Sequence, residues 1–185
     1  MLQPRKLYLI RHGRPSAGFG EALDPGLDEI GRGQAEALAQ ELAPLGPLPI
    51  ITSPLRRARE TAAPLERLWK AAARVEPAVA ELPTPGADPQ ARAVWLRTVL
   101  KGCWRELSVR HQQWREQVIA TLVSGEASTV ITTHFIAINI AVGAATGDDR
   151  LVCCEPDHCS CTMLEVREGR LRLVSLGRQR ETQVL

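Results

Sequence analysis

The stretch KLYLIRHGRP, residues 6–15, decides the fold. Four apolar residues at 7–10 run without interruption into the polar sequence RHGR at 11–14. A short and wholly apolar run is typical of a strand that is buried on both faces of a sheet. The stretch therefore predicts a buried strand that carries guanidinium and imidazole groups to one edge of that sheet.

Two further runs, at 48–52 and 129–133, have the same aliphatic and β-branched character. Helical patterns separate the three runs, and this alternation predicts an α/β fold, a three-layer sandwich with a mostly parallel central sheet flanked by helices. Polar residues follow every run: SPLRR at 53–57 follows the second and His134 follows the third. Because parallel sheets bind ligands at the carboxyl ends of their strands, two histidines and several arginines are expected to meet at one edge.

The remaining elements follow from apolar periodicity and from the residues that begin and end helices. Asp28 is the expected N-cap of the first helix and Ile30 belongs to its apolar stripe, whereas Pro64 is expected to kink or divide the second. The C-terminus is expected to form two strands joined at Glu168 and Gly169. The helices are expected at 29–42, at about 55–73, at 88–123 as one or two helices with a break at Gly102, and from 134 to a stop at Gly147.

Length and composition predict one domain covering residues 1–185. The net charge of +2 is too small to indicate a nucleic-acid partner or a membrane surface. No apolar run approaches the ~20 residues that a membrane-spanning helix needs, and the N-terminus lacks the apolar core of a signal peptide. We therefore expect a cytoplasmic protein.

Four of the five cysteines crowd into CCEPDHCSC at 153–161. An odd number of cysteines in a chain of this size is not a disulfide framework, so reduced thiols are expected. The segment CSCTM at 159–163 reads as a half-buried strand in which cysteine acts as a small hydrophobe. A zinc site built from these thiols and His158 is the alternative, and it predicts stoichiometric metal in the purified protein.

The polar residues at the predicted sheet edge suit phosphoryl-transfer chemistry. Arg11, Arg57 and His134 would form a positive pocket whose natural occupant is a phosphate. His12, left unprotonated and fixed in one tautomer by a hydrogen bond, could attack the phosphorus atom directly. Glu81 stands alone among apolar residues in AVAELPTPG and is the candidate general acid, because burial would raise its pKa. This chemistry needs no metal and no cofactor.

The same motifs resemble those of the histidine phosphatase superfamily, also called the phosphoglycerate mutase-like family, and the likeness covers most of the chain. LIRHG at 9–13 is similar to the family's signature. LDEIGRGQA at 27–35, SPLRRARETA at 53–62 and TTHFIA at 132–137 resemble three further family segments, in the family's order.

The resemblance implies a phosphoglycerate mutase-like fold and a phosphoric monoester hydrolase that becomes phosphorylated on His12. It implies that Arg11, Arg57 and His134 bind the phosphoryl group and that Glu81 is the acid. The implied partner is a small phosphate ester; sugar phosphates, nucleotide-pathway intermediates and a phosphorylated protein all remain open.

Several positions depart from the family pattern or lie on the substrate side of the motifs. Arg14 stands where the family often has Glu, Gln or Asn, and another positive charge there would favour a substrate with a second anionic group. Gly13, Ser16 and Phe135 are the other substrate-side candidates. His158, where the family commonly has asparagine, belongs either to the edge of the site or to a strand.

Three other polar residues are expected outside the site. His111 is expected to be structural on a helix face, and Arg56 and Arg59 are expected on a solvated one.

Two other function classes remain beside the phosphatase. The first is a phosphoglycerate mutase, although the family's mutases are generally longer between the second arginine motif and the second histidine. The second is a phosphate-binding module without turnover, which would bind phosphate or vanadate but would form no phosphoenzyme.

Overall fold

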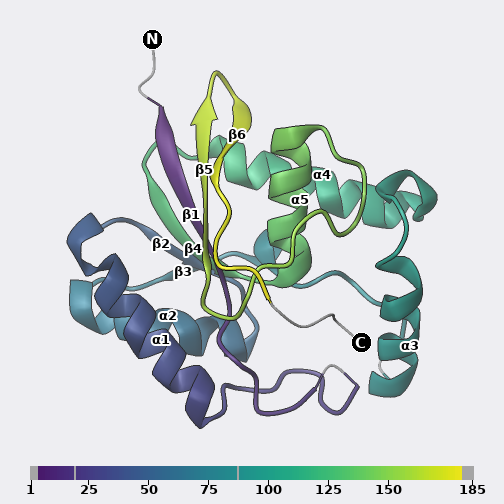
Figure 1. The fold of residues 1–185 in the computed structure, drawn as a ribbon, viewed down its shortest axis with the longest axis horizontal. Helices are drawn as coiled ribbons and strands as arrows, with labels where there is room; N and C mark the ends of the chain where they lie inside the picture. Colours follow the sequence, from purple (N-terminus) through teal and green to yellow (C-terminus); the bar gives the residue numbers. More distant parts are fainter. Residues whose placement is uncertain (1–3, 19, 87, 181–185) are drawn as a thin grey trace.

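The computed structural model describes residues 4–18, 20–86 and 88–180. Its six strands form one sheet in the order β3-β2-β4-β1-β5-β6, which Figure 1 shows between two groups of helices. The pairs β3–β2, β2–β4 and β4–β1 are parallel, whereas β5 runs antiparallel to β1 and β6 antiparallel to β5. The strands are β1 (Arg5–Arg11), β2 (Ile50–Thr52), β3 (Arg74–Val75), β4 (Thr129–Thr133), β5 (Cys161–Arg167) and β6 (Arg170–Ser175).

The helices cover both faces of the sheet, which confirms the predicted sandwich and the mostly parallel sheet. On one face, α1 and α2 pack over Tyr8 and Ile10 of β1. On the other, α4 and α5 pack over Leu7 and Leu9. The helices are α1 (Glu29–Leu42), α2 (Arg56–Trp69), α3 (Pro89–Val99), α4 (Val109–Ser124) and α5 (Phe135–Thr146).

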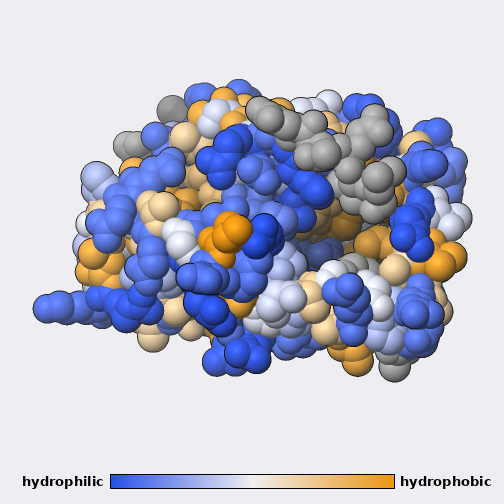
Figure 2. All heavy atoms as spheres, turned by 60° about the horizontal axis from the view of Figure 1, so that its bottom comes forward, coloured by the Kyte–Doolittle hydropathy of each residue, from blue (hydrophilic) through white to orange (hydrophobic). Residues whose placement is uncertain are grey.

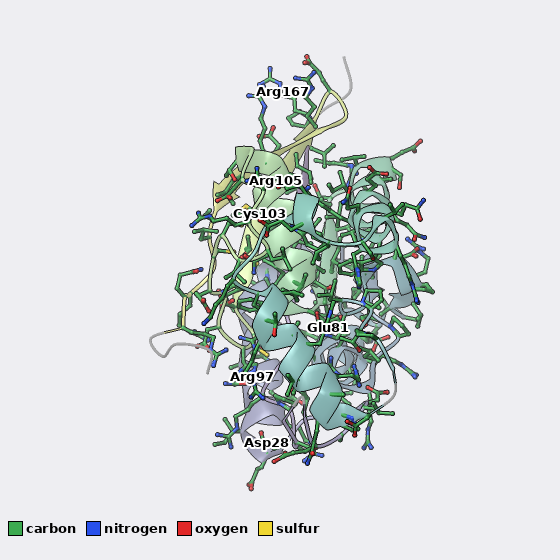
Figure 3. The ribbon with its side chains drawn as sticks, turned by 90° about the vertical axis from the view of Figure 1, so that its right-hand side faces the viewer. Asp28, Glu81, Arg97, Cys103, Arg105 and Arg167 are labelled. Atoms are coloured by element: carbon green, nitrogen blue, oxygen red, sulfur yellow. The ribbon has the colours of Figure 1, made fainter. Side chains whose placement is uncertain are left out.

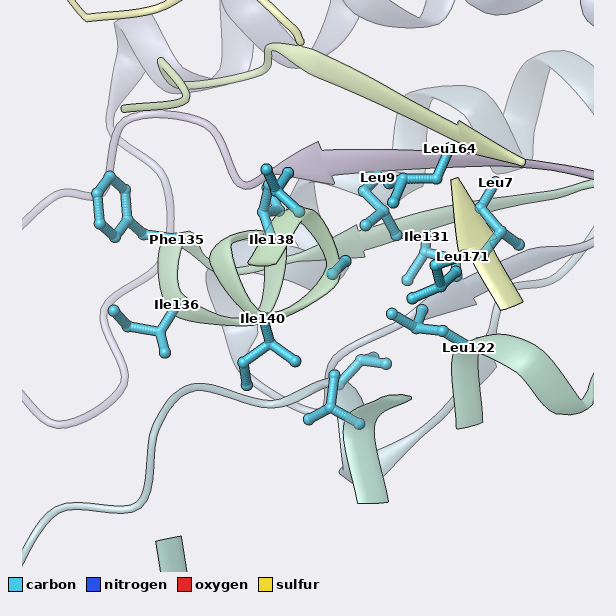
Figure 4. Packing of buried hydrophobic residues seen from close by; sticks show 14 of the residues in the cluster. Leu7, Leu9, Leu122, Ile131, Phe135, Ile136, Ile138, Ile140, Leu164 and Leu171 are labelled. Atoms are coloured by element: carbon cyan, nitrogen blue, oxygen red, sulfur yellow. The ribbon is translucent and has the colours of Figure 1, made fainter. Parts of the chain in front are cut away.

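The three predicted apolar runs are neighbours at the centre of the sheet. Leu9 of β1 pairs with Ile131 of β4, and Ile50 of β2 pairs with Val130. Figure 4 shows Leu7, Leu9 and Ile131 gathered with other aliphatic residues against the helices. Full burial of a side chain of this size contributes roughly 1.5–3 kcal/mol, so the sheet centre holds the site's scaffold firmly.

The helix α1 begins where the sequence predicts, but one of its expected core residues lies outside. The Asp28 carboxylate accepts the Gly31 N–H at 2.7 Å and caps the helix. Ile30, which we expected in the apolar stripe, is 51% exposed. At 100° per residue Ile30 lies well off the face that Ala35 and Leu38 share, whereas Gly31 lies on it and is buried.

Two further expectations at helix boundaries have different outcomes. Pro64 does not divide α2, which is one helix from Arg56 to Trp69 and ends four residues earlier than expected, at a left-handed C-cap on Lys70. The break at Gly102 is confirmed, since this residue lies between α3 and a short 3-10 turn that leads to α4.

The C-terminal hairpin forms as predicted, with a modified first strand. Glu168 and Gly169 both have positive φ, the conformation of a two-residue hairpin turn. The strand β5 begins at Cys161, two residues later than expected. Its alternation also differs, because Thr162 is fully buried whereas Cys161 and Met163 are only partly buried against the α1–α2 side. The reason is that helices cover both faces of the sheet, so both faces of this strand are enclosed.

Gly31 permits a close approach between α1 and the loop that follows β1. A Cβ atom at this position would lie 2.1 Å from the Arg14 carbonyl oxygen, whereas a Cβ at Gly33, on the same helix, would meet nothing within 4 Å. We expect Gly31→Ala to lower the free energy of unfolding by about 1–3 kcal/mol through overpacking. Gly33→Ala is the matched control and should raise it by up to about 1 kcal/mol through helix propensity. Urea denaturation of both variants tests this, and equal stabilities would contradict it.

In the described ranges, no helix combines the length and the apolar character that crossing a bilayer requires.

Candidate active site

The carboxyl ends of β1, β2 and β4 lie side by side, and the predicted polar residues meet there. The backbone N–H of His12 donates to the Thr133 carbonyl at 3.0 Å, which fixes the residue after β1 against the end of β4. His134 is the N-cap of α5, and its ring centroid is 5.2 Å from that of His12. Arg57, in the first turn of α2, donates from Nε to His12 Nε2 at 3.2 Å.

The hydrogen bonds of His12 assign its tautomer. Nδ1 lies 2.8 Å from the Gly13 carbonyl oxygen, and because a carbonyl only accepts, Nδ1 carries the proton. Nε2 therefore keeps its lone pair, which faces the Arg57 guanidinium. Burial, with the neighbouring His134, Arg57 and Arg11, lowers the pKa of His12 well below its usual value. The ring is neutral at physiological pH, with one nucleophilic nitrogen.

Two buried guanidinium groups flank this imidazole. Arg11 donates from one terminal nitrogen to the Pro156 carbonyl at 2.9 Å and lies over the ring of Phe135. Its Nε is buried and has no hydrogen-bond partner among the described residues. Burial lowers the pKa of Arg11 to about 10 and also lowers that of Arg57, and at neutral pH both remain charged. Buried donors with spare capacity and a positive charge suit an anion such as phosphate.

His134 lies beneath these groups and is fully buried. Its Nε2 is 2.7 Å from the Ser53 hydroxyl oxygen, and its Nδ1 is 3.6 Å from Glu81 Oε2 without a hydrogen-bond partner among the described residues. Burial lowers the pKa of His134 well below its usual value, and the positive charges of Arg57 and Arg11 lower it further. The contact with Glu81 is consequently not an ion pair at neutral pH.

Glu81 follows the short 3-10 turn Pro77–Val79, and its side chain is 13% exposed. One carboxylate oxygen accepts the Leu82 N–H at 3.0 Å. Burial raises the pKa of Glu81, and this effect outweighs the opposite influence of Arg57, the Leu82 hydrogen bond and Arg11. A carboxyl group whose pKa is raised in this way suits a general acid.

Apart from His134, which is fully buried and is not among the described lining residues, these groups open into a cavity of about 190 Å³, seen as the hollow near the centre of the face in Figure 2. Its polar lining consists of Arg11, His12, Arg57, Glu81, His158 and Arg180. The His158 ring centroid is 5.8 Å from that of His12, so this residue lies at the edge of the site. Burial, and secondarily Arg11, lowers the pKa of His158 to about 4.

The substrate-side candidates separate into two groups. Phe135 lines the cavity, whereas Gly13, Arg14 and Ser16 are not among its described lining residues. The Arg14 Nε instead donates to Asp28 Oδ2 at 2.5 Å, outside the cavity.

Sequence reasoning missed two residues of the site. Thr61 accepts the Gly13 N–H at 2.9 Å and donates to the Arg57 carbonyl at 2.7 Å, which ties the His12 loop to α2. Its place within SPLRRARETA was the available signal. Arg180 lines the cavity from the C-terminal segment, where no motif pointed to it.

The polar residues expected outside the site lie outside it. His111 contacts Ser108 and the Pro83 carbonyl and stacks on Trp95. Arg56 and Arg59 are exposed on α2.

The cysteines do not assemble a metal centre among the described residues, where no group of three or more His, Cys, Asp or Glu side chains is placed to hold an ion. All five thiols are free. Cys153 and Cys154 instead gather around the side chain of the buried Asn139, whose Oδ1 accepts both of their backbone N–H groups.

The buried histidines should make stability sensitive to acid. His12, His134 and His158 have lowered pKa values, so below the unfolded value near 6.5 the unfolded chain binds protons that the folded protein does not. The free energy of unfolding therefore falls as pH drops from about 7 to 5. The raised pKa of Glu81 has the opposite effect on stability, but it is a single group and the histidines are three. We expect a lower Tm at pH 5.5 than at pH 7.5 in phosphate-free buffer, and a smaller difference in His158→Asn. An unchanged difference in that variant would contradict the assignment.

Comparisons with known proteins identify the family of the chain. Residues 7–179 match the family described as the histidine phosphatase superfamily (branch 1). Glucosyl-3-phosphoglycerate phosphatase of Mycobacterium tuberculosis is 41% identical over 68 residues, and this match covers 35% of the chain but only 30% of the relative's length.

Solved structures extend the likeness over the whole fold. The native structure of a mycobacterial glucosyl-3-phosphoglycerate phosphatase is 25% identical, with a TM-score of 0.73 over 94% of this chain and 99% of that one. A phosphoserine phosphatase from Entamoeba histolytica, solved with 3-phosphoglyceric acid, has a TM-score of 0.74 at 20% identity, over 95% of this chain and 98% of that one, and it shows the fold alone.

Proposed function

Because the chain belongs to the histidine phosphatase superfamily (branch 1), we propose that it is a phosphatase that hydrolyses a phosphomonoester through a phosphohistidine on His12. The observation that carries the proposal is the unprotonated Nε2 of His12, held beside the Arg57 guanidinium in a buried and positively charged pocket. The phosphatases among the relatives and solved structures support hydrolysis as the reaction.

In the first step, His12 Nε2 attacks phosphorus, the N–P bond forms and the P–O ester bond breaks. The Gly13 carbonyl holds the proton on Nδ1, so the attacking nitrogen needs no base. Arg11 and Arg57, which line the cavity, stabilise charge on the equatorial oxygens, and we assign the same role to His134, whose Nδ1 has no hydrogen-bond partner among the described residues. Glu81 gives its proton to the leaving oxygen, and its raised pKa keeps that proton available.

In the second step, the Glu81 carboxylate takes a proton from water while the water oxygen attacks phosphorus. The N–P bond breaks, phosphate leaves and His12 returns to its neutral form. No metal or cofactor enters this sequence. The five free thiols support the cytoplasm as its location.

The test separates a phosphatase from a mutase and from a binding module. Purified protein is incubated with a panel of phosphomonoesters, released phosphate is measured, and 3-phosphoglycerate is followed in parallel for conversion to its 2-isomer. We expect phosphate release without interconversion. Interconversion would replace the proposal with a mutase, and phosphate binding without release would replace it with a binding module.

A further inference from the structure

The cavity wall beyond the phosphate-binding groups is apolar. Nine of its fifteen described lining residues are Ala, Pro, Leu, Ile or Phe. Ala22, Leu23 and Pro25 come from the loop between β1 and α1, and Leu96 and Leu100 come from α3 and its C-cap. In Figure 2, orange hydrophobic residues border the hollow on its right-hand side.

The two apolar walls belong to segments that meet each other. A Cβ atom built on Gly20 would lie 3.3 Å from the Ala93 Cβ of α3, so the loop after β1 contacts this helix. Figure 3 faces α3, with Glu81 of the same cavity labelled beside it. Leu23 is 50% exposed and lines the cavity, so its apolar side chain is accessible to a ligand at the opening.

The wall offers little to a polar leaving group. None of the described lining residues is Ser, Thr, Asn, Gln, Tyr or Lys. The remaining cationic side chain, Arg180, lies near Arg11 and His158, since its charge influences the pKa of both. A leaving group rich in hydroxyls would lose its water hydrogen bonds in this cavity and find few side chains to replace them.

The charge at Arg14, which would favour a second anionic group, is engaged elsewhere. Its guanidinium pairs with Asp28, the N-cap of α1, and Arg14 is not among the described residues that line the cavity. The ion pair with Asp28 offsets part of this charge, although Arg14 still lowers the pKa of His158 at the edge of the site.

Building on the phosphatase activity proposed above, we infer that the substrate is a phosphomonoester of an apolar alcohol, whose alkyl or aryl group lies between α3 and the loop that follows β1. The phosphoryl end is held by Arg11 and Arg57, and discrimination among esters comes from the apolar wall.

A series of straight-chain alkyl phosphates tests the substrate class, because chain length hardly changes the intrinsic reactivity of the ester. We expect kcat/KM to rise about fourfold for each methylene from propyl to hexyl phosphate. Glycerol 3-phosphate, with the same three carbons as propyl phosphate and two hydroxyls, should be the poorer substrate. A flat or falling series, or a preference for glycerol 3-phosphate, would overturn the inference.

Two variants of α3 locate the effect. Leu96→Gln should flatten the rise between propyl and hexyl phosphate, whereas Val94→Gln, at a position on the same helix that is 57% exposed, should preserve it. The ratio of the two substrates is measured on one preparation, so partial loss of folded protein cancels. An equal ratio in Leu96→Gln and the unaltered protein would place the selectivity elsewhere and overturn the assignment.

A binding measurement keeps this inference separable from the proposed activity. Propyl- and hexylphosphonate cannot be hydrolysed, and calorimetry gives their affinities directly. Tighter binding of hexylphosphonate supports the apolar subsite even if no ester is turned over, in which case only the phosphatase proposal fails. Turnover combined with equal phosphonate affinities overturns the subsite and leaves the phosphatase.

Discussion

Replacement of His12 by asparagine is expected to lower phosphatase kcat by about 10⁴-fold or more, the effect of removing the nucleophile of a covalent mechanism. Asparagine keeps a polar side chain near Arg57 but has no ring nitrogen with a lone pair to attack phosphorus. Labelling with a radioactive phosphate ester, followed by rapid quenching, should give a phosphoprotein in the unaltered enzyme that is labile in acid and stable in alkali. The variant should give none.

The control for this result is His111→Asn, which removes a histidine outside the cavity. It should keep the phosphoenzyme and most of the activity. A His12→Asn protein that is folded by circular dichroism and still forms the acid-labile phosphoprotein would exclude His12 as the nucleophile.

Glu81→Gln should produce the second largest effect, a loss of about 10²–10⁴-fold in kcat/KM with an alkyl phosphate. An alkoxide is a poor leaving group and needs the proton that Glu81 supplies. With p-nitrophenyl phosphate the loss should be much smaller, because nitrophenolate leaves without protonation. Equal losses with both esters would contradict a role for Glu81 as general acid.

The pH profile gives the same residue an independent signature. The first step requires protonated Glu81, so kcat/KM for an alkyl ester should fall as pH rises through the raised pKa of this group. The Gln variant should lack that alkaline limb. On the acid side, activity should persist below pH 6.5, because burial holds the pKa of His12 well below that value.

The order of strands and helices, and the clustering of charged residues at one edge of the sheet, could be predicted because both follow from the hydrophobic pattern of short segments. The runs that became β1, β2 and β4 are apolar enough to be buried on two faces, and parallel strands bring the residues that follow them to one edge. Asp28 and Gly147 marked helix ends through well-understood capping chemistry, and both serve as caps.

The features that the sequence did not predict depend on contacts that no local pattern reports. Arg14 lies close behind β1, yet its partner Asp28 is fourteen residues further along the chain, and no local pattern reports that ion pair. The two-residue strand β3 has no apolar signal, because both of its residues are exposed. The apolar wall could not be foreseen, since it forms only where a loop and a distant helix meet.

The helix α3 contributes no fully buried residue, although two leucines on it and at its C-cap line the cavity. Substitutions at its exposed positions therefore cost little folding free energy, whereas substitutions of the fully buried residues of β1 or α5 are destabilising. Natural selection could exchange one ester for another by altering α3 and leave the phosphoryl-transfer machinery untouched. Divergence among descendants of this protein should accordingly concentrate in that helix, and a laboratory library restricted to its exposed positions would keep most of its members folded.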